Sequence, residues 1–146
     1  MPPAPSRPDP FGAFRFLVEI DGIPRASFTE CKGLDSETTV VEYRTGDLRT
    51  HLKLPGITRF SNITLRRGLT RDLSLYRWRQ TVVEGAPERK NGSVLLLDDG
   101  NTPVLRWNFR NGWPCKLSGP ALNARAEEVA IETLEIAHEG LELEGD

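Results

Sequence analysis

Few side chains in this sequence are of the types that usually carry out catalysis or bind metal ions. The only histidines are His51 and His138, and the only cysteines are Cys31 and Cys115. A zinc site needs three or four such ligands at close spacing, and these four residues lie far apart in the sequence. The sequence therefore predicts no metal ion and no catalytic pair formed by the two histidines.

The acidic pair Asp98-Asp99 is the other arrangement that could do chemistry, as a carboxylate pair or a cation site. It is followed by Gly100-Asn101, and this composition is typical of a plain turn. No serine lies in a Gly-x-Ser-x-Gly context, and no glycine-rich phosphate loop is present. We therefore predict no catalytic residue, no cofactor and no enzymatic activity.

The two cysteines could form a disulfide, but a chain of 146 residues does not need one to be stable. Two reduced thiols in a cytosolic product are the preferred interpretation. Lys32 is the only basic neighbour of Cys31, and no partner base is evident. We therefore expect a packed thiol at Cys31 rather than a reactive one.

Charge is unevenly distributed along the chain. The formal net charge is −2, but residues 126–146 hold eight acidic residues and no lysine or arginine. Residues 1–125 hold 19 basic against 13 acidic residues, and the basic excess is concentrated in residues 44–90. Such a division is compatible with a nucleic-acid surface or with two faces that meet in an assembly.

Basic and aromatic residues are interleaved in the basic region, as in modules that bind single-stranded nucleic acid. These residues are Arg66, Arg67, Arg71, Tyr76, Arg77, Trp78 and Arg79. The sequence pI of about 5.8 is, however, well below that of a typical basic binding domain. Nucleic-acid binding is therefore the weaker hypothesis.

Length and composition predict a single domain at residues 11–146, preceded by a Pro-rich arm at residues 1–10. The prolines of this arm exclude a helix or a central strand, so we expect it to be flexible. No apolar run approaches the roughly 18 residues of a membrane span. The first residues also lack the apolar core of a secretory signal. We expect no membrane insertion by this chain alone.

Short strands separated by turns account for most of the sequence pattern. Strands are expected at residues 14–20, 23–28, 38–43, 62–67, 93–97, 104–109 and 113–117, with turns at residues 21–22, 98–101 and 111–112. Residues 44–56 contain Gly46 and Pro55-Gly56 with weak periodicity, which predicts a long loop or an irregular hairpin.

One helix is predicted, over residues 71–84. Thr70 is its expected N-cap, and Gly85 marks its end. Apolar residues at helical spacing form one stripe along this segment. The stripe consists of Leu69, Leu73, Tyr76 and Val83, with Trp78 and Val82 close beside it.

Residues 124–143 fit two patterns. Apolar positions from residue 126 to residue 137 recur at helical spacing, and alanine and glutamate favour helix. A strand would place Val129 and Ile131 on one face but Leu134 and Ile136 on the other. From periodicity alone, the segment slightly favours helix.

Nine ordered segments closely resemble the inner tail tube proteins of contractile phage tails and of extracellular contractile injection systems. The resemblance covers roughly residues 10–143, nearly the whole chain. The segments are FRFLVEIDG at 14–22, FTECKGL at 28–34, VEYR at 41–44, KLPG at 53–56, NITLRRG at 62–68, ERKN at 88–91, RWNF at 106–109, GPALN at 119–123, and EVAIE at 128–132 running on to AHEGL at 137–141.

The resemblance implies a mainly β fold, a small β-barrel or sandwich flanked by the one helix. It also implies that residues 129–138 form a strand, against the periodicity. His138, in the Ala-His-Glu-Gly segment, would then make a structural hydrogen bond. A surface position is the expectation for His51.

The same resemblance implies a structural, self-assembling role. Six copies would form a ring, and stacked rings would form a hollow tube inside a contractile sheath, attached to baseplate and spike-hub proteins. The lumen would hold cargo, either an effector protein or, in a phage, DNA. Assembly would take place in the cytoplasm of the producing cell. A tube-initiator ring protein at the baseplate resembles the tube subunit and is the alternative.

Two sets of residues are candidate assembly sites. The first is the long loop, a suitable contact between stacked rings, with Arg44, Asp47, Arg49, His51 and Lys53. The second is an acidic face in the C-terminal segment, with Glu128, Glu132, Glu135 and Glu139. Opposite charges on the two sets would be complementary within or between rings.

Overall fold

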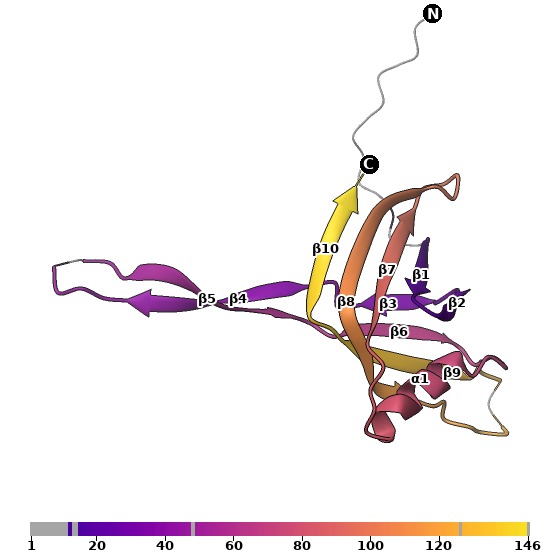
Figure 1. Cartoon of the computed structure of the whole chain (residues 1–146). Helices are drawn as coiled ribbons and strands as arrows, with labels where there is room; N and C mark the ends of the chain where they lie inside the picture. The colour runs from indigo at the N-terminus through magenta and orange to yellow at the C-terminus, as the bar shows by residue number, and fades with distance from the viewer. Residues whose placement is uncertain (1–11, 13–14, 48, 126, 146) are drawn as a thin grey trace, which may run out of the picture.

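The computed structural model describes residue 12 and residues 15–47, 49–125 and 127–145 (Figure 1). The expected Pro-rich arm, and Phe14 of the first expected strand, lie outside the described residues. In chain order, the elements are β1 (Phe16–Ile20), β2 (Ile23–Ala26), β3 (Glu30–Lys32), β4 (Ser36–Tyr43), β5 (Leu52–Phe60), β6 (Ile63–Gly68), α1 (Ser74–Val83), β7 (Lys90–Leu97), β8 (Pro103–Ser118), β9 (Ile131–Ala137) and β10 (Gly140–Gly145).

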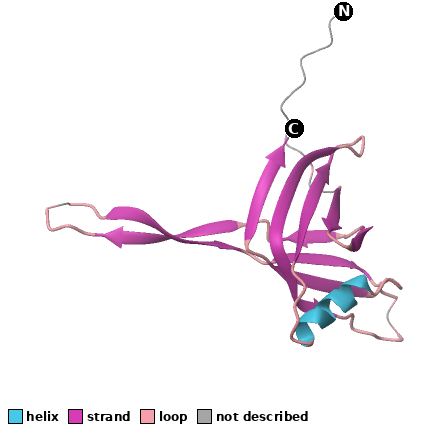
Figure 2. Cartoon of the chain, in the orientation of Figure 1, coloured by secondary structure: helices cyan, strands magenta, loops and turns pink. Residues whose placement is uncertain are grey.

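Two sheets share the long strand β8 and enclose one core (Figure 2). The first half of β8 pairs with β7 and β10, and β1 and β2 continue the sheet beyond β7. The second half pairs with β9, which is followed by β6 and β3. The outermost strands β2 and β3 do not pair with each other, so the sheets remain open. The mainly β prediction is confirmed, in the form of an open sandwich with one helix.

Strand β8 bends from one sheet into the other at Asn111 and Gly112. A turn was expected there, but the strand continues through both residues. Asn111 has a φ of 51°, in the left-handed region that asparagine tolerates. A Cβ atom on Gly112 would lie 2.7 Å from the Phe109 ring and 3.0 Å from Ile136. Glycine therefore lets the strand bend directly over the core.

The core lies between the two sheets and under α1. Its fully buried apolar residues are Val18, Ile20, Phe28, Ile63, Leu65, Leu75, Trp78, Val94, Phe109, Leu134 and Ile136. The strands expected at residues 14–20 and 62–67 are confirmed as β1 and β6, and alternate residues of both point inward. The turn at Asp21-Gly22 is also confirmed, because it joins β1 to β2, and Gly22 has a φ of 75°.

The helix favoured by periodicity in residues 124–143 is wrong, and the strand implied by the family resemblance is confirmed. Residues 131–137 form β9, and its buried face consists of Glu132, Leu134 and Ile136. One core position of this strand is therefore a glutamate. The sequence pattern hid the strand because an acidic residue stands where an apolar one is expected.

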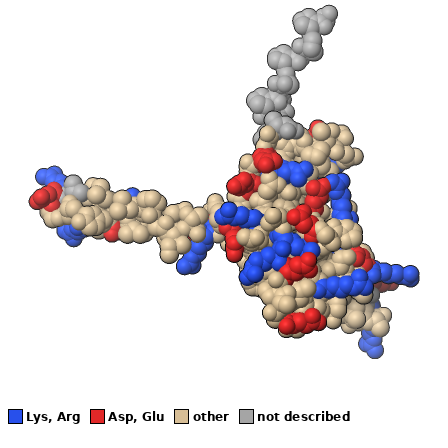
Figure 3. Space-filling view, in the orientation of Figure 1, with Lys and Arg blue, Asp and Glu red and all other residues tan. Residues whose placement is uncertain are grey.

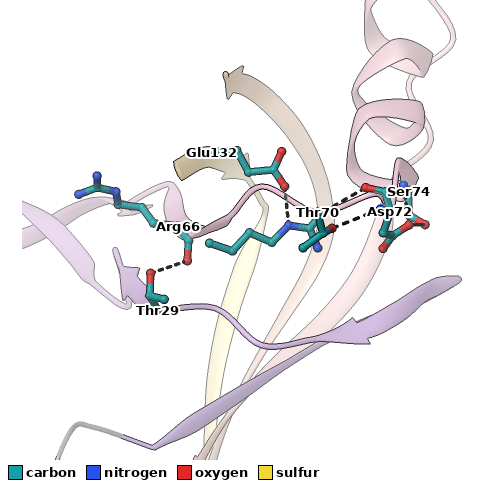
Figure 4. Close-up of polar contacts among 7 residues, drawn as sticks. Thr29, Arg66, Thr70, Asp72, Ser74 and Glu132 are labelled. Atoms are coloured by element: carbon teal, nitrogen blue, oxygen red, sulfur yellow. Dashed lines mark hydrogen bonds and ion pairs between the residues drawn. The ribbon is translucent and has the colours of Figure 1, made fainter. Parts of the chain in front are cut away.

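Glu132 is kept in the core by an ion pair with Arg67, which lies directly opposite it on β6. The exposed fractions are 9% for Glu132 and 4% for Arg67. Arg67 Nε donates to Glu132 Oε1, and the guanidinium carbon lies 5.6 Å from the centre of the Phe28 ring. Figure 4 shows Glu132 on its strand, and a dashed line marks the bond that its carboxylate accepts. The pair thus joins β6 and β9, the two central strands of the sheet formed by β8, β9, β6 and β3.

Helix α1 begins later than the sequence predicted, and Thr70 is not its N-cap. Leu73 occupies that position without a side-chain cap. Thr70 Oγ1 instead accepts from the Asp72 N–H at 3.2 Å, and Asp72 Oδ1 accepts from the Ser74 N–H at 3.0 Å and from the Ser74 hydroxyl at 2.6 Å (Figure 4). These bonds from Ser74 lower the pKa of the Asp72 carboxyl. Two successive turns, at residues 70–72 and 72–74, therefore occupy the positions where the helix was expected to begin.

The C-terminal end of α1 is as predicted. Gly85 has a φ of 83°, its N–H donates to Val82 O, and the Ala86 N–H donates to Thr81 O. This pair of bonds is the Schellman arrangement, which satisfies the last carbonyl groups of a helix. Glycine is required because other residues rarely adopt this backbone conformation.

Replacing Glu132 with alanine is expected to lower the free energy of unfolding by about 3–5 kcal/mol, because Arg67 would remain buried without a partner. Replacing both residues, as R67M together with E132L, is expected to restore most of that loss. The exposed residue Glu128 provides the control, and E128A is expected to change stability by less than about 0.5 kcal/mol. Urea unfolding of the monomer, followed by tryptophan fluorescence, measures all three. A small effect of E132A alone would contradict this account.

Candidate assembly surfaces

Strands β4 and β5 form a two-stranded arm that projects from the body (Figures 1 and 2). They pair only with each other, and every residue from Ser36 to Tyr43 is exposed. In β5 only Phe60, at the root, is partly buried. The predicted long loop at residues 44–56 is therefore mostly a hairpin, the second form that the sequence allowed, with its connection at residues 44–51.

One face of the arm is apolar. Val41 pairs with Leu54 and Tyr43 with Leu52 in the strand register, so these four side chains share a face. Their exposed fractions are 49%, 48%, 53% and 46% in that order. We call these four residues the arm face. In water an isolated two-stranded hairpin is marginally stable at best, so this surface is typical of an element that packs against a partner.

The candidate ring-contact residues all lie on the arm and are exposed. Arg44 follows β4, and Asp47 and Arg49 lie in the connection at the tip. Lys53 pairs with Glu42 on the face opposite the arm face, and His51 Nδ1 lies 3.3 Å from Glu42 Oε2. Figure 3 shows charged atoms at the tip and a largely uncharged shaft behind it. The structure therefore gathers these residues at one projecting element.

His138 joins the root of the arm to the body. Its Nε2 lies 2.9 Å from Ser61 O, just after β5, and its Nδ1 lies 3.1 Å from Gly140 O. The ring also packs near Phe60 and Phe109, with centroid distances of 5.8 Å and 6.1 Å. The histidine is thus occupied by structural contacts, as expected for this segment, and it fixes the direction in which the arm leaves.

The four candidate acidic residues do not share one face. Glu128 is exposed in the segment before β9, whereas Glu132 is buried against Arg67. Glu135 points to the opposite side of β9 and accepts from Asn62 Nδ2 at 2.8 Å. Glu139, after β9, accepts from Asn111 Nδ2 at 2.7 Å. The acidic face proposed from sequence is therefore divided, because alternate residues of a strand point in opposite directions.

The four residues predicted to form an apolar stripe are exposed, and two of them, Leu69 and Leu73, precede α1. Leu75 and Trp78 are the buried residues of α1, and Trp78 Nε1 donates to Glu88 O at 2.7 Å. The stripe residues Leu69, Leu73, Tyr76 and Val83 are 51%, 51%, 52% and 60% exposed. Contiguous apolar residues on a surface often mark protein contacts. Sequence periodicity identified this stripe but assigned it no partner.

Open strand edges are a third surface available for assembly. In the described part of the chain, β10 pairs on one side only, with β8. β2 and β3 end the two sheets at the other edges. An uncovered edge has free backbone N–H and C=O groups that can pair with another chain. Glu142 and Glu144 place negative charge along β10.

The polar side chains form no reactive arrangement in the described residues. No group of three or more His, Cys, Asp or Glu residues there is placed to hold a metal ion. Both cysteines are free thiols, and burial raises the pKa of Cys31 to about 11. A hollow of about 470 Å³ lies on the sheet that contains β1, β7, β8 and β10, and Glu19 and Arg106 are among its lining residues. These two residues already form an ion pair at 3.6 Å. The exposed apolar and backbone surfaces are thus the features that need a partner.

Residues 12–142 match the family model of the T4-like virus tail tube protein gp19. The match covers most of the chain. The chain belongs to this tail tube family. It is a structural tail tube protein of the kind found in phage tails and contractile injection particles, which accounts for an arm and edges that lack a partner within one chain.

Solved structures with the same fold belong to such particles. The chain is 26% identical to a protein in the sheath–tube complex of the PVC extracellular contractile injection system, with a TM-score of 0.85 over 94% of this chain and 93% of that one. It is 24% identical to a protein in the cap of the anti-feeding prophage, with a TM-score of 0.87 over 99% and 97%.

The fold is also shared at lower similarity by Hcp1. Hcp1 from Flavobacterium johnsoniae is 20% identical, with a TM-score of 0.56 over 90% of this chain and 95% of that one. No curated protein matches the sequence significantly. Within the described residues, no helix has the length and apolar character needed to cross a membrane.

An acidic residue on the arm face is expected to block assembly without destabilising the body. Leu54→Asp should raise the protein concentration needed for assembly by at least about tenfold, because a carboxylate would have to be buried at the contact. Thermal unfolding of the monomer should be unchanged, since Leu54 is 48% exposed. Sedimentation velocity measures the assembly.

Val40→Asp is the matched control for this arm variant. Val40 is 62% exposed and pairs with Pro55, on the opposite face of the same arm. The V40D substitution introduces the same charge as L54D and a similar loss of strand preference. We expect V40D to assemble at nearly the wild-type concentration. Equal impairment by both variants, or none by either, would contradict the assignment of the arm face.

Proposed function

We propose that this chain is the main subunit of the inner tube of a contractile injection particle or phage tail, and that six copies form each ring of a stacked tube. The observation that supports this most directly is the arm. It has an apolar face of four residues and a charged tip, and among the described residues the hydrogen bond between His138 and Ser61 joins it to the body at its root. An arm of this kind reaches beyond its own ring, so it suits a contact between stacked rings.

Ring formation itself uses the open edges of the sheets. Pairing of β10 with an edge strand of a neighbouring copy would cover two exposed edges at once. Such a contact joins two different surfaces, and it closes into a ring when the rotation between neighbours fits. The rigid sandwich, continuous through β8, provides the fixed geometry that closure requires.

The proposed partners follow from the relatives. The PVC relative lies in a complex of sheath and tube, and a further match, 24% identical, lies in the baseplate of the anti-feeding prophage. A sheath around the tube and a baseplate with a spike hub below it are therefore the expected partners of this chain. The lumen would hold an effector protein, or DNA in a phage, and assembly would take place in the cytoplasm of the producing cell.

A ring protein that initiates the tube at the baseplate is the second candidate. The relative in the anti-feeding prophage cap, which terminates the tube, supports a role at a tube end, because it has the same fold. Both roles use the same sandwich and the same arm. In the main tube subunit, the arm face would bind a further ring of the same chain. In the initiator, it would not.

Negative-stain microscopy of the purified full chain tests the proposal. We expect hexameric rings at low concentration and long stacked tubes at high concentration, because both surfaces that need a partner are present on every copy. A variant in which an Asn-Gly turn replaces residues 44–51 should still form rings but should not form long tubes. Persistent single rings of the wild type would indicate the initiator. A strictly monomeric wild type at high concentration would overturn both roles.

A further inference from the structure

One side of the sandwich has an apolar groove that the described residues leave open. β2 and β3 end the two sheets and do not pair with each other. The groove lies between β3 and the inner face of the sheet that contains β1 and β7, and its volume is about 280 Å³. We call it the side groove. Its lining residues include Gly12, Phe16, Cys31, Leu34, Leu96 and Trp107.

The side groove is an open extension of the core. In the strand register Cys31 lies opposite Leu65, and Trp107 lies opposite Val94. Leu65 and Val94 are core residues, so Cys31 and Trp107 face inward with them. Both are nevertheless only partly buried. Covering the groove with an apolar side chain would remove more of this surface from water, which is favourable.

The polar groups in the described lining of the groove already have partners. The carboxylate of Glu30 pairs with Lys32 at 2.9 Å and with Arg66 at 3.3 Å. The Thr29 hydroxyl donates to Arg66 O at 3.1 Å. An apolar occupant therefore fits the groove better than a charged ligand does, because it needs no new polar partner.

The first described residue of the chain lies at the groove. Gly12 is that residue, and it has no side chain to fill the opening that it lines. Phe11 stands directly before it in the sequence and is the only aromatic residue among residues 1–11. Consecutive Cα atoms are about 3.8 Å apart. An aromatic side chain is thus attached one residue away from an apolar groove.

We propose that the Phe11 side chain occupies the side groove of its own chain, and that the N-terminal segment thereby closes the open side of the sandwich. A buried aromatic side chain removes about 150–250 Å² of surface from water. Attachment through Gly12 keeps the ring at a high effective concentration beside the groove. The contact needs one chain only, so it does not depend on the tube function.

The prolines before Phe11 keep this closure separate from assembly. Five of residues 1–10 are prolines, and a proline has no N–H to donate to a neighbouring strand. The segment is therefore unsuited to pair along β3 as a regular strand. Phe11 would fill the groove while the edge of β3 stays available to a neighbouring copy.

The two cysteines make this contact measurable in the full chain. Cys31 lines the groove, and burial raises the pKa of its thiol to about 11. Cys115 lies elsewhere, where its Sγ donates to Glu135 O at 3.4 Å. Because the thiolate is the reactive form, the rate of reaction with Ellman's reagent reports how well each thiol is covered. C115S chains report on Cys31 and C31S chains on Cys115, at concentrations where sedimentation velocity finds a monomer.

Phe11→Ser is expected to raise the reaction rate of Cys31 at least about tenfold, because water and reagent would enter the groove. Phe11→Leu is the matched variant, since it keeps an apolar side chain and should change that rate less than about twofold. The rate of Cys115 should stay the same in both. An unchanged Cys31 rate in F11S overturns the proposal. An equal increase at Cys115 also overturns it, because that result would indicate general loosening.

Dilution tests whether the occupant comes from the same chain. An intramolecular contact protects Cys31 equally at every monomer concentration. The wild-type rate should therefore stay constant over about a hundredfold dilution. A rate that rises on dilution would assign the groove to a second copy and overturn docking within the chain.

Photo-cross-linking provides a second measurement that needs no loss of the contact. Phe11 is replaced by p-benzoylphenylalanine in the full chain, the monomer is irradiated, and the adducts are located by mass spectrometry. We expect intramolecular adducts at Leu34, Leu96 or Trp107. The same replacement at Pro3 is the matched control and should give no preferred adduct in the groove. Adducts from position 11 that are spread over the surface, or that form only between chains, overturn the docking.

Discussion

A two-stranded hairpin cannot bury either of its own faces, and the arm formed by β4 and β5 is such a hairpin. Its backbone groups are paired within the arm, but its four apolar residues remain in water unless another surface covers them. The rest of the structure depends on this constraint. The body provides a fixed base, His138 holds the root of the arm, and the open edges provide neighbours that can bring a covering surface into reach.

The base must be rigid, because a small change of angle at the root moves the tip by a much larger distance. Two features provide this rigidity. β8 runs through both sheets, so they cannot rotate independently. The buried pair of Arg67 and Glu132 ties β6 to β9 directly beside the start of α1. Such a pair adds little net stability compared with apolar residues, but it admits only one register, because a shifted strand would leave two charges unpaired.

Sequence reasoning succeeded where the partner of a residue is local. The strand β1, its turn at Asp21-Gly22 and the end of α1 at Gly85 all follow from neighbouring residues. It failed in β9, because Glu132 is explained only by Arg67, which lies 65 residues away. At the arm it succeeded only in part: the strand at residues 38–43 and a possible hairpin at residues 44–56 were expected, but neighbouring residues do not show that the hairpin projects from the body, because that depends on the absence of contacts with the two sheets.

The charge division along the sequence shows why net charge of a segment does not define a surface. Of the four acidic residues assigned to one face, Glu132 neutralises a buried arginine, while Glu135 and Glu139 accept from asparagine side chains. Glu128 and Glu139 are both exposed outside β9, but Glu139 already accepts from Asn111. Alternation within β9 makes such a split unavoidable once the segment is a strand. The exposed apolar side chains of the arm and the open strand edges are therefore better guides to a contact between copies than the net charge of a segment.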